Sequence, residues 1–104
     1  MKIFLISDNI DTATGLRLVG IDGVVVHEEN EFKDALKKVL ADNEIGILLV
    51  MEKMARDYSE LIDEIKLGRK LPLVVEIPDR HGTGRDMEFI TSYIKEAIGV
   101  KLNK

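Results

Sequence analysis

The sequence predicts an α/β domain with a four-stranded parallel sheet in the order 2-1-3-4, flanked by helices, and one further helix at the C-terminus. Short apolar runs alternate with segments of helical periodicity in the order β-α-β-α-β-α-β. That order requires parallel strands joined by right-handed crossovers. The chain has 104 residues, 45% hydrophobic and 33% charged, which suits one globular domain.

The first strand and the first helix are expected within residues 2–20. Lys2–Ser7 is a continuous apolar run, which indicates a strand covered on both faces. Side chains that can cap a helix follow it, namely Asp8, Asn9 and Asp11. A short helix over about residues 11–19 should end at Gly20 in the left-handed conformation. The side chains expected to face the core are Ala13, Leu16 and Val19.

The remaining strands are predicted over residues 23–26, 45–50 and 72–77, with helices between them. Asn30 is the expected cap of the second helix. Its apolar residues recur at helical spacing: Phe32, Ala35, Leu36, Val39 and Leu40. A single third helix should end at Gly68 and carry Met54, Tyr58, Leu61, Ile62 and Ile65 on one side. The sheet order is that of flavodoxin-like folds.

Three parts are expected along the chain: an α/β head over residues 1–78, a flexible joint over residues 79–85, and a partner-docking helix over residues 86–104. The joint, DRHGTGR, is polar, and its two glycines free the backbone. The predicted helix after it has two adjacent apolar stripes, one of which contains Phe89 and Tyr93. The other, called the seam below, has coiled-coil spacing and consists of Met87, Ile90, Ile94, Ala97 and Ile98. Either both stripes pack on the head, or the seam binds a partner helix.

The composition argues against several classes of function. The net charge is -4 and no dense Lys/Arg block is present, so no nucleic-acid partner is expected. Cysteine is absent, which excludes disulfides and thiolate sites. No apolar run approaches the ~20 residues that span a bilayer. We expect a cytoplasmic protein that does not insert into membranes directly.

Two residues that could be reactive, Asp8 and Asp11, are better explained by a structural role. Asp8 and Asp11 resemble part of the acidic pocket of a receiver domain, but Val50-Met51-Glu52 lacks the phospho-acceptor Asp. A receiver also needs a fifth strand followed by Lys, and the pattern contains none. Capping of the first helix is the better interpretation.

Three other candidates are weaker still. His81–Arg85 could cradle a phosphate, yet it matches neither established phosphate-loop pattern. His27 has no partner for nucleophilic catalysis. Glu76 lies in an apolar strand and needs a Lys, an Arg or a backbone donor. No catalytic residue, cofactor or metal is therefore expected. A small phosphate- or nucleotide-binding regulator and a homo-oligomer stay open as alternatives.

Two segments carry a family resemblance. Asp11–Ile21 (DTATGLRLVGI) is similar to the D-T-x-T-G-(F/L)-x-L-x-G-I stretch of the F subunit of the V-type/A-type ATPase central stalk. Pro72–Pro78 (PLVVEIP) resembles the P-x-(I/V/L)-x-E-I-P segment of the same family, and Gly46–Val50 agrees too. The joint departs from the family, where many members have a Lys/Asp/Pro-rich loop.

The resemblance implies a non-catalytic rotor subunit of an ATP-synthesising or ATP-hydrolysing, ion-transporting complex. Its C-terminal helix would pack on the long coiled coil of the D subunit, and the pair would rotate within the A3B3 hexamer, where the ATP chemistry occurs. The seam is where the contact with the D subunit is expected. The protein would be peripheral to the membrane through this complex. Whether protons or sodium ions are pumped is left open.

Overall fold

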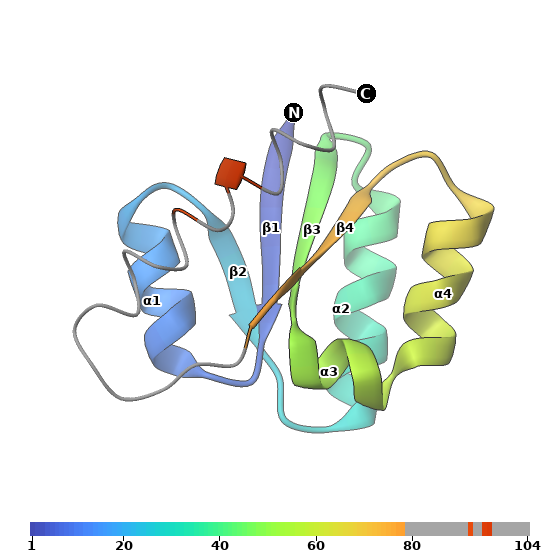
Figure 1. The fold of residues 1–104 in the computed structure, drawn as a ribbon, viewed down its shortest axis with the longest axis horizontal. Helices are drawn as coiled ribbons and strands as arrows, with labels where there is room; N and C mark the ends of the chain where they lie inside the picture. Colours follow the sequence, from blue (N-terminus) through green and yellow to red (C-terminus); the bar gives the residue numbers. More distant parts are fainter. Residues whose placement is uncertain (79–91, 93–94, 97–104) are drawn as a thin grey trace.

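A computed structural model describes residues 1–78, 92, 95 and 96 of the chain. All four strands are parallel and lie in the order β2-β1-β3-β4 (Figure 1). They span Lys2–Ser7 (β1), Asp22–Val25 (β2), Ile45–Met51 (β3) and Leu73–Ile77 (β4). The predicted fold class and strand order are confirmed.

Four helices connect the strands: α1 (Ile10–Leu18), α2 (Glu29–Ala41), α3 (Glu52–Asp57) and α4 (Ser59–Gly68). The step from β1 to β2 runs in one direction across the sheet, and the next two steps run in the other. Right-handed crossovers therefore place α1 on one face and the other three helices on the opposite face. In Figure 1, α1 lies beside β2, and α2 and α4 lie next to each other toward the β4 edge.

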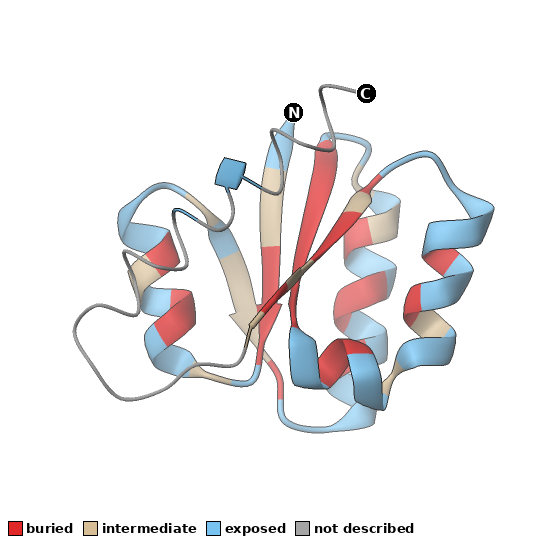
Figure 2. Cartoon of the chain, in the orientation of Figure 1, coloured by how far each residue is buried: buried red, intermediate tan, exposed pale blue. Residues whose placement is uncertain are grey.

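The core is centred on β3, which is buried along its whole length (Figure 2). The register sets Leu5, Leu49 and Val75 side by side across three strands, and none of them is more than 3% exposed. Such a strand, covered on both faces, reads as an unbroken apolar run because no position needs to meet water. The predicted inward residues of α2 are also buried, except Leu40, which is half-buried.

Three local predictions are wrong. The single third helix is two helices, α3 and α4, divided at Tyr58, whose backbone (φ -116°, ψ 38°) leaves the helical region. The cap of α2 is Glu28, since the helix already begins at Glu29 and includes Asn30. Val19 is 55% exposed because α1 ends at Leu18 and the chain turns through Gly20, at φ 90°. The left-handed conformation predicted for Gly20 is confirmed.

Candidate functional site

The carboxyl end of β1 is the edge at which open α/β sheets bind ligands. Here a polar side chain caps the N-terminus of α1. Asn9 Oδ1 accepts hydrogen bonds from the backbone N–H groups of Asp11 (2.8 Å) and Thr12 (3.2 Å). The backbone N–H of Asn9 donates to Ser7 Oγ, at 2.9 Å. Capping is confirmed for Asn9, which is the N-cap of α1, whereas Asp11 lies inside the helix and donates its backbone N–H to that cap.

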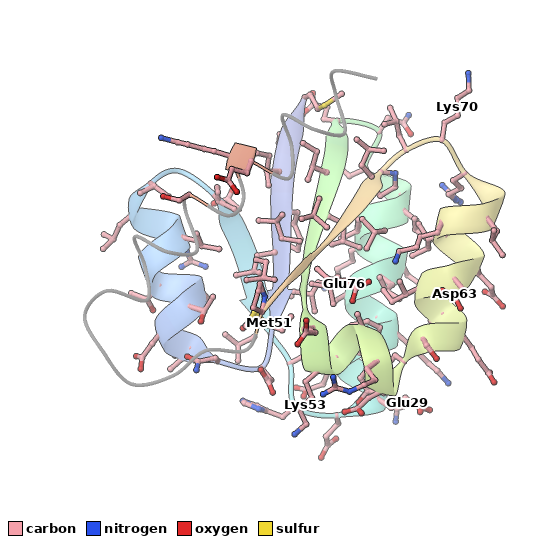
Figure 3. All side chains as sticks on the ribbon, in the orientation of Figure 1. Glu29, Met51, Lys53, Asp63, Lys70 and Glu76 are labelled. Carbon is pink, nitrogen blue, oxygen red and sulfur yellow. The ribbon has the colours of Figure 1, made fainter. Side chains whose placement is uncertain are left out.

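The last position of β3 is the second element of a phosphotransfer pocket. Met51 occupies it and is 2% exposed, so an apolar side chain fills the place of a phospho-acceptor (Figure 3). Glu52, the next residue, is exposed and is the first residue of α3. Asp8 and Asp11 are exposed as well. The carboxyl edge of the sheet therefore carries carboxylates that face water. The side chain at the end of β3 cannot accept a phosphoryl group.

His27 contributes its backbone to the start of α2. Its N–H donates to Glu31 Oε1 at 2.8 Å, and the N–H of Glu28 donates to the same oxygen at 3.1 Å. These two hydrogen bonds favour the ionised carboxylate and lower the pKa of Glu31. The exposed His27 is thus part of a helix start, in which Glu31 reaches back to N–H groups ahead of the first turn.

Glu76 has the cationic partner that its position in an apolar strand requires. Lys66 Nζ, near the end of α4, lies 3.0 Å from Glu76 Oε2. The two side chains are 39% and 41% exposed. Figure 3 shows Glu76 on the edge strand β4. The ion pair links α4 to that strand, and the carboxylate stays accessible to water. This arrangement agrees with a structural role for Glu76.

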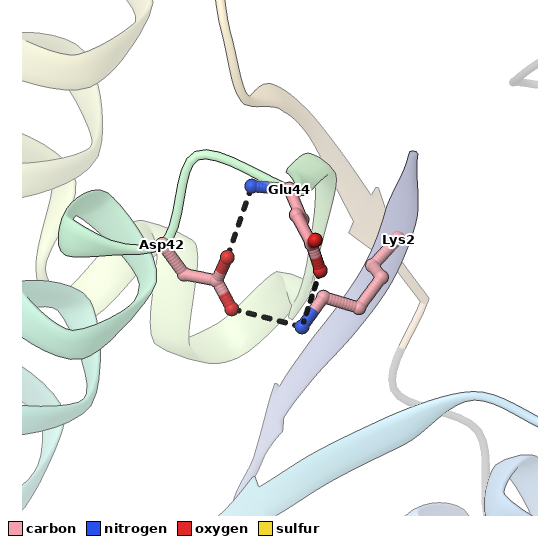
Figure 4. A network of polar contacts seen from close by, with 3 residues as sticks. All are labelled: Lys2, Asp42 and Glu44. Atoms are coloured by element: carbon pink, nitrogen blue, oxygen red, sulfur yellow. Dashed lines mark hydrogen bonds and ion pairs between the residues drawn. The ribbon is translucent and has the colours of Figure 1, made fainter.

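A second polar cluster joins the start of β1 to the turn before β3 (Figure 4). Lys2 Nζ lies 2.9 Å from Asp42 Oδ2 and 3.4 Å from Glu44 Oε2. The backbone N–H of Glu44 also donates to Asp42 Oδ1, at 2.9 Å. The hydrogen bond from Lys2 is the main cause that lowers the pKa of Asp42, and the same bond raises the pKa of Lys2. The cluster ties two chain segments together by charge.

Sequence patterns did not reveal a groove between α2 and α4. One part has a volume of about 210 Å³ and is mostly apolar, lined by Lys33, Leu36, Lys37, Leu40, Leu61, Glu64 and Ile65. A neighbouring polar hollow of about 310 Å³ also contains Lys33 and Leu61. The two hollows share these two lining residues, and the mostly apolar one is called the α2/α4 groove below. A period read along one helix cannot show how far two helices stand apart.

No cluster of three or more metal-ligating side chains occurs in the part of the chain that the structure describes. Within the same residues, no helix has the length and apolarity needed to cross a bilayer.

The seam lies outside the described residues, and so does the His81–Arg85 loop. The predicted contact of Met87, Ile90, Ile94, Ala97 and Ile98 stays a prediction. Ser92, Lys95 and Glu96, from the same segment, are described, helical and exposed. Polar exposed positions between the seam positions are what the predicted amphipathic helix requires.

Comparison with known proteins gives a consistent result over nearly the whole chain. The family model described as ATP synthase (F/14-kDa) subunit matches residues 3–94. A protein of Methanothermobacter thermautotrophicus, named as the F subunit of an A-type ATP synthase, is 34% identical over 96 residues, which cover 90% of each chain. The protein of the same name from Methanocaldococcus jannaschii is 31% identical and covers 98% of this chain and 99% of its own. That from Pyrococcus abyssi is 28% identical over the full length of both.

Proposed function

Since the chain belongs to the family of the ATP synthase (F/14-kDa) subunit, we propose that it is a non-catalytic central-stalk component that binds the coiled-coil D subunit. In this role it couples ATP hydrolysis or synthesis in the A3B3 hexamer to ion transport. Its relatives are named as F subunits of an A-type ATP synthase, and this chain would work in a complex of that kind.

The observation that carries the proposal is the surplus of apolar surface in the C-terminal segment. Two apolar stripes follow residue 86, and one helix packed on a sheet needs only one of them. The seam has the spacing with which a helix packs along a coiled coil. The exposed positions Ser92, Lys95 and Glu96 agree with such a helix. We therefore assign residues 1–78 to the head, 79–85 to a joint and 86–104 to docking.

The described head supports a non-catalytic role. Its carboxylates at the carboxyl edge stand beside a capped helix, and the acceptor position is a buried methionine. Glu76 is held by Lys66. A protein that transmits motion needs a rigid body and a binding surface, and it can lack a reaction centre.

The test is co-purification with the D subunit of the same complex. Ile94→Asp places a charge in the seam, where desolvation without a partner is costly, so the one-to-one complex should be lost. Ser92→Asp adds the same charge at an exposed position of the same segment and should leave the complex intact. Thermal unfolding of both variants should match the unchanged chain. If Ile94→Asp unfolds the head, or if it binds the coiled-coil partner as well as Ser92→Asp does, the proposal is wrong.

A further inference from the structure

One face of the sheet is only half covered by the described helices. Right-handed crossovers leave α1 on this face and place α2, α3 and α4 on the other. α1 has nine residues and packs against β1 and β2, and Figure 1 shows it beside β2. A helix is about 10 Å across and neighbouring strands lie about 4.8 Å apart, so one helix covers about two strands. The half of this face formed by β3 and β4 therefore needs a further cover.

The side chains on this half can be identified from Glu76. Its ion pair with Lys66 of α4 places Glu76 on the face of the other three helices. Because successive side chains of a strand alternate between faces, the odd-numbered residues of β4 point to the α1 side, together with their register partners in β3. These six side chains, called the β3/β4 half-face below, are Leu73, Val75, Ile77, Ile47, Leu49 and Met51.

The β3/β4 half-face is apolar and buried (Figure 2). Five of its six side chains are 0–3% exposed, and Leu73 is half-buried. Burial to this extent requires a covering layer, which α1 is too narrow and too far across the sheet to supply alone. The chain leaves β4 at Ile77, at the carboxyl end of this same half-face. The residues that follow Pro78 are thus well placed to form the cover.

We propose that residues 86–98 cover the β3/β4 half-face through Phe89 and Tyr93, called the aromatic stripe below, so that the seam points away from the head. Phe89 and Tyr93 are four residues apart and lie on one side of a helix. Each precedes a seam residue, Ile90 or Ile94, and one residue along a helix is a rotation of about 100°. Two different surfaces can therefore cover the two stripes at the same time.

The lengths agree with this arrangement. β3 has seven residues and is about 23 Å long, and a helix over residues 86–98 is about 20 Å long. The joint, residues 79–85, can span about 23 Å, which is ample to turn the chain back across layers about 10 Å apart. Lys95 is exposed and lies about 200° around the helix from Tyr93, so it would face water when Tyr93 faces the sheet.

The inference rests on the proposed function only for the role of the seam. It adds that the same segment has two separate contacts, one with its own head and one with the coiled-coil partner. The aromatic stripe would hold the helix beside the sheet, and the partner would then meet a seam that is already oriented. Such an arrangement lowers the entropy lost when the helix binds.

Tyr93→Asp and Ile94→Asp form a matched pair, because they add the same charge at neighbouring positions of one segment. Tyr93→Asp should lower the Tm of the full-length chain by about 8 °C or more, since a buried ring is replaced by a charge that cannot cover the sheet. Ile94→Asp should change Tm by less than about 2 °C, because the seam faces water in the free chain. Scanning calorimetry measures both. Equal Tm values for the two variants would overturn the inference.

Cross-linking locates the helix independently, because the chain contains no cysteine of its own. A short thiol cross-linker should join Leu73→Cys to Tyr93→Cys and should not join Leu73→Cys to Lys95→Cys. Equal cross-linking of the two pairs, or none in either, would overturn the inference. The cross-linked chain should still bind the D subunit. Loss of binding on cross-linking would show that the helix must leave the sheet to bind, which would also overturn it.

The two proposals fail in different ways. If Tyr93→Asp melts like the unchanged chain while Ile94→Asp loses the complex with the D subunit, the inference is wrong and the proposed function stands. If the Leu73–Tyr93 cross-link forms but the unchanged chain binds no coiled-coil partner, the packing of the aromatic stripe stands and the proposed function is wrong.

Discussion

The ring of Tyr58 stacks on the ring of Phe32, with centroids 4.4 Å apart and planes inclined by 25°. Phe32 belongs to α2 and is completely buried, while Tyr58 stands at the break between α3 and α4. The Tyr58 carbonyl still accepts from the backbone N–H groups of Leu61 and Ile62, both at 3.1 Å. The break therefore redirects the chain without losing the start of α4, and the stacked pair joins that junction to α2.

Replacing Tyr58 by alanine should destabilise the head by about 2–4 kcal/mol, because it removes both the stacking and part of the apolar cover over Phe32. Tyr58→Phe keeps the ring and should change the free energy of unfolding by less than about 1 kcal/mol. Urea denaturation of both variants measures the difference. Equal stability of the alanine and phenylalanine variants would show that the stacked pair contributes nothing.

Asn9→Ala should destabilise the protein by about 0.5–2 kcal/mol, the usual effect of removing an N-cap side chain. Two backbone N–H groups at the start of α1 would lose their acceptor. Asn9→Asp retains a side-chain oxygen and should stay close to the unchanged protein. Chemical denaturation followed by circular dichroism compares the two, and a loss of stability in the aspartate variant alone would contradict this account of the cap.

The Lys2–Asp42 pair should make stability fall at acid pH. Because the folded pKa of Asp42 is below its ordinary value near 4, the unfolded chain binds more protons between these two pKa values. The contribution of Asp42 is therefore complete above about pH 4 and is lost as pH falls through the folded pKa. Glu31, whose pKa is also lowered, acts in the same direction.

Asp42→Asn isolates this effect, since its amide oxygen can still accept from the Glu44 N–H while the ion pair with Lys2 is gone. The urea midpoint of the unchanged protein should decline more steeply below pH 5 than that of Asp42→Asn. Added salt should narrow the difference, as the cluster is exposed. Parallel declines at low salt would show that Asp42 titrates alike in the folded and unfolded chain.

Much of the fold could be predicted because its causes are local. The unbroken apolar run of β3 and the helical period of α2 each follow from burial along one element. The turn at Gly20, two residues after α1 ends at Leu18, follows from a single residue that tolerates positive φ. The division at Tyr58 could not be predicted, because the apolar period continues through it. The stacking of Tyr58 on Phe32 is a contact between two different helices, which no pattern along one helix contains.

The candidate surfaces depend even more on contacts between different elements, which the sequence pattern of one element does not contain. The need of Glu76 for a cation could be inferred from its strand, but its choice of Lys66 depends on how α4 lies against β4. The α2/α4 groove requires the separation and rotation of two helices, which no pattern within either one contains. The seam could be proposed from spacing alone, and it stays a prediction because its five residues lie outside the described part of the chain.

Incubation with acetyl phosphate and Mg²⁺ should leave the intact mass of the protein unchanged. A receiver needs a carboxylate at the end of β3 to attack phosphorus, and here Met51, a thioether side chain buried in the core, holds that position. Asp8 and Asp11 are exposed and could attract a cation, but the last residue of β3 is not a carboxylate that could take the phosphoryl group. Intact-mass spectrometry, with a receiver domain treated in parallel to show that the reagent is active, measures the outcome. Phosphorylation of either aspartate would restore the phosphate-binding regulator as the better account of this edge of the sheet.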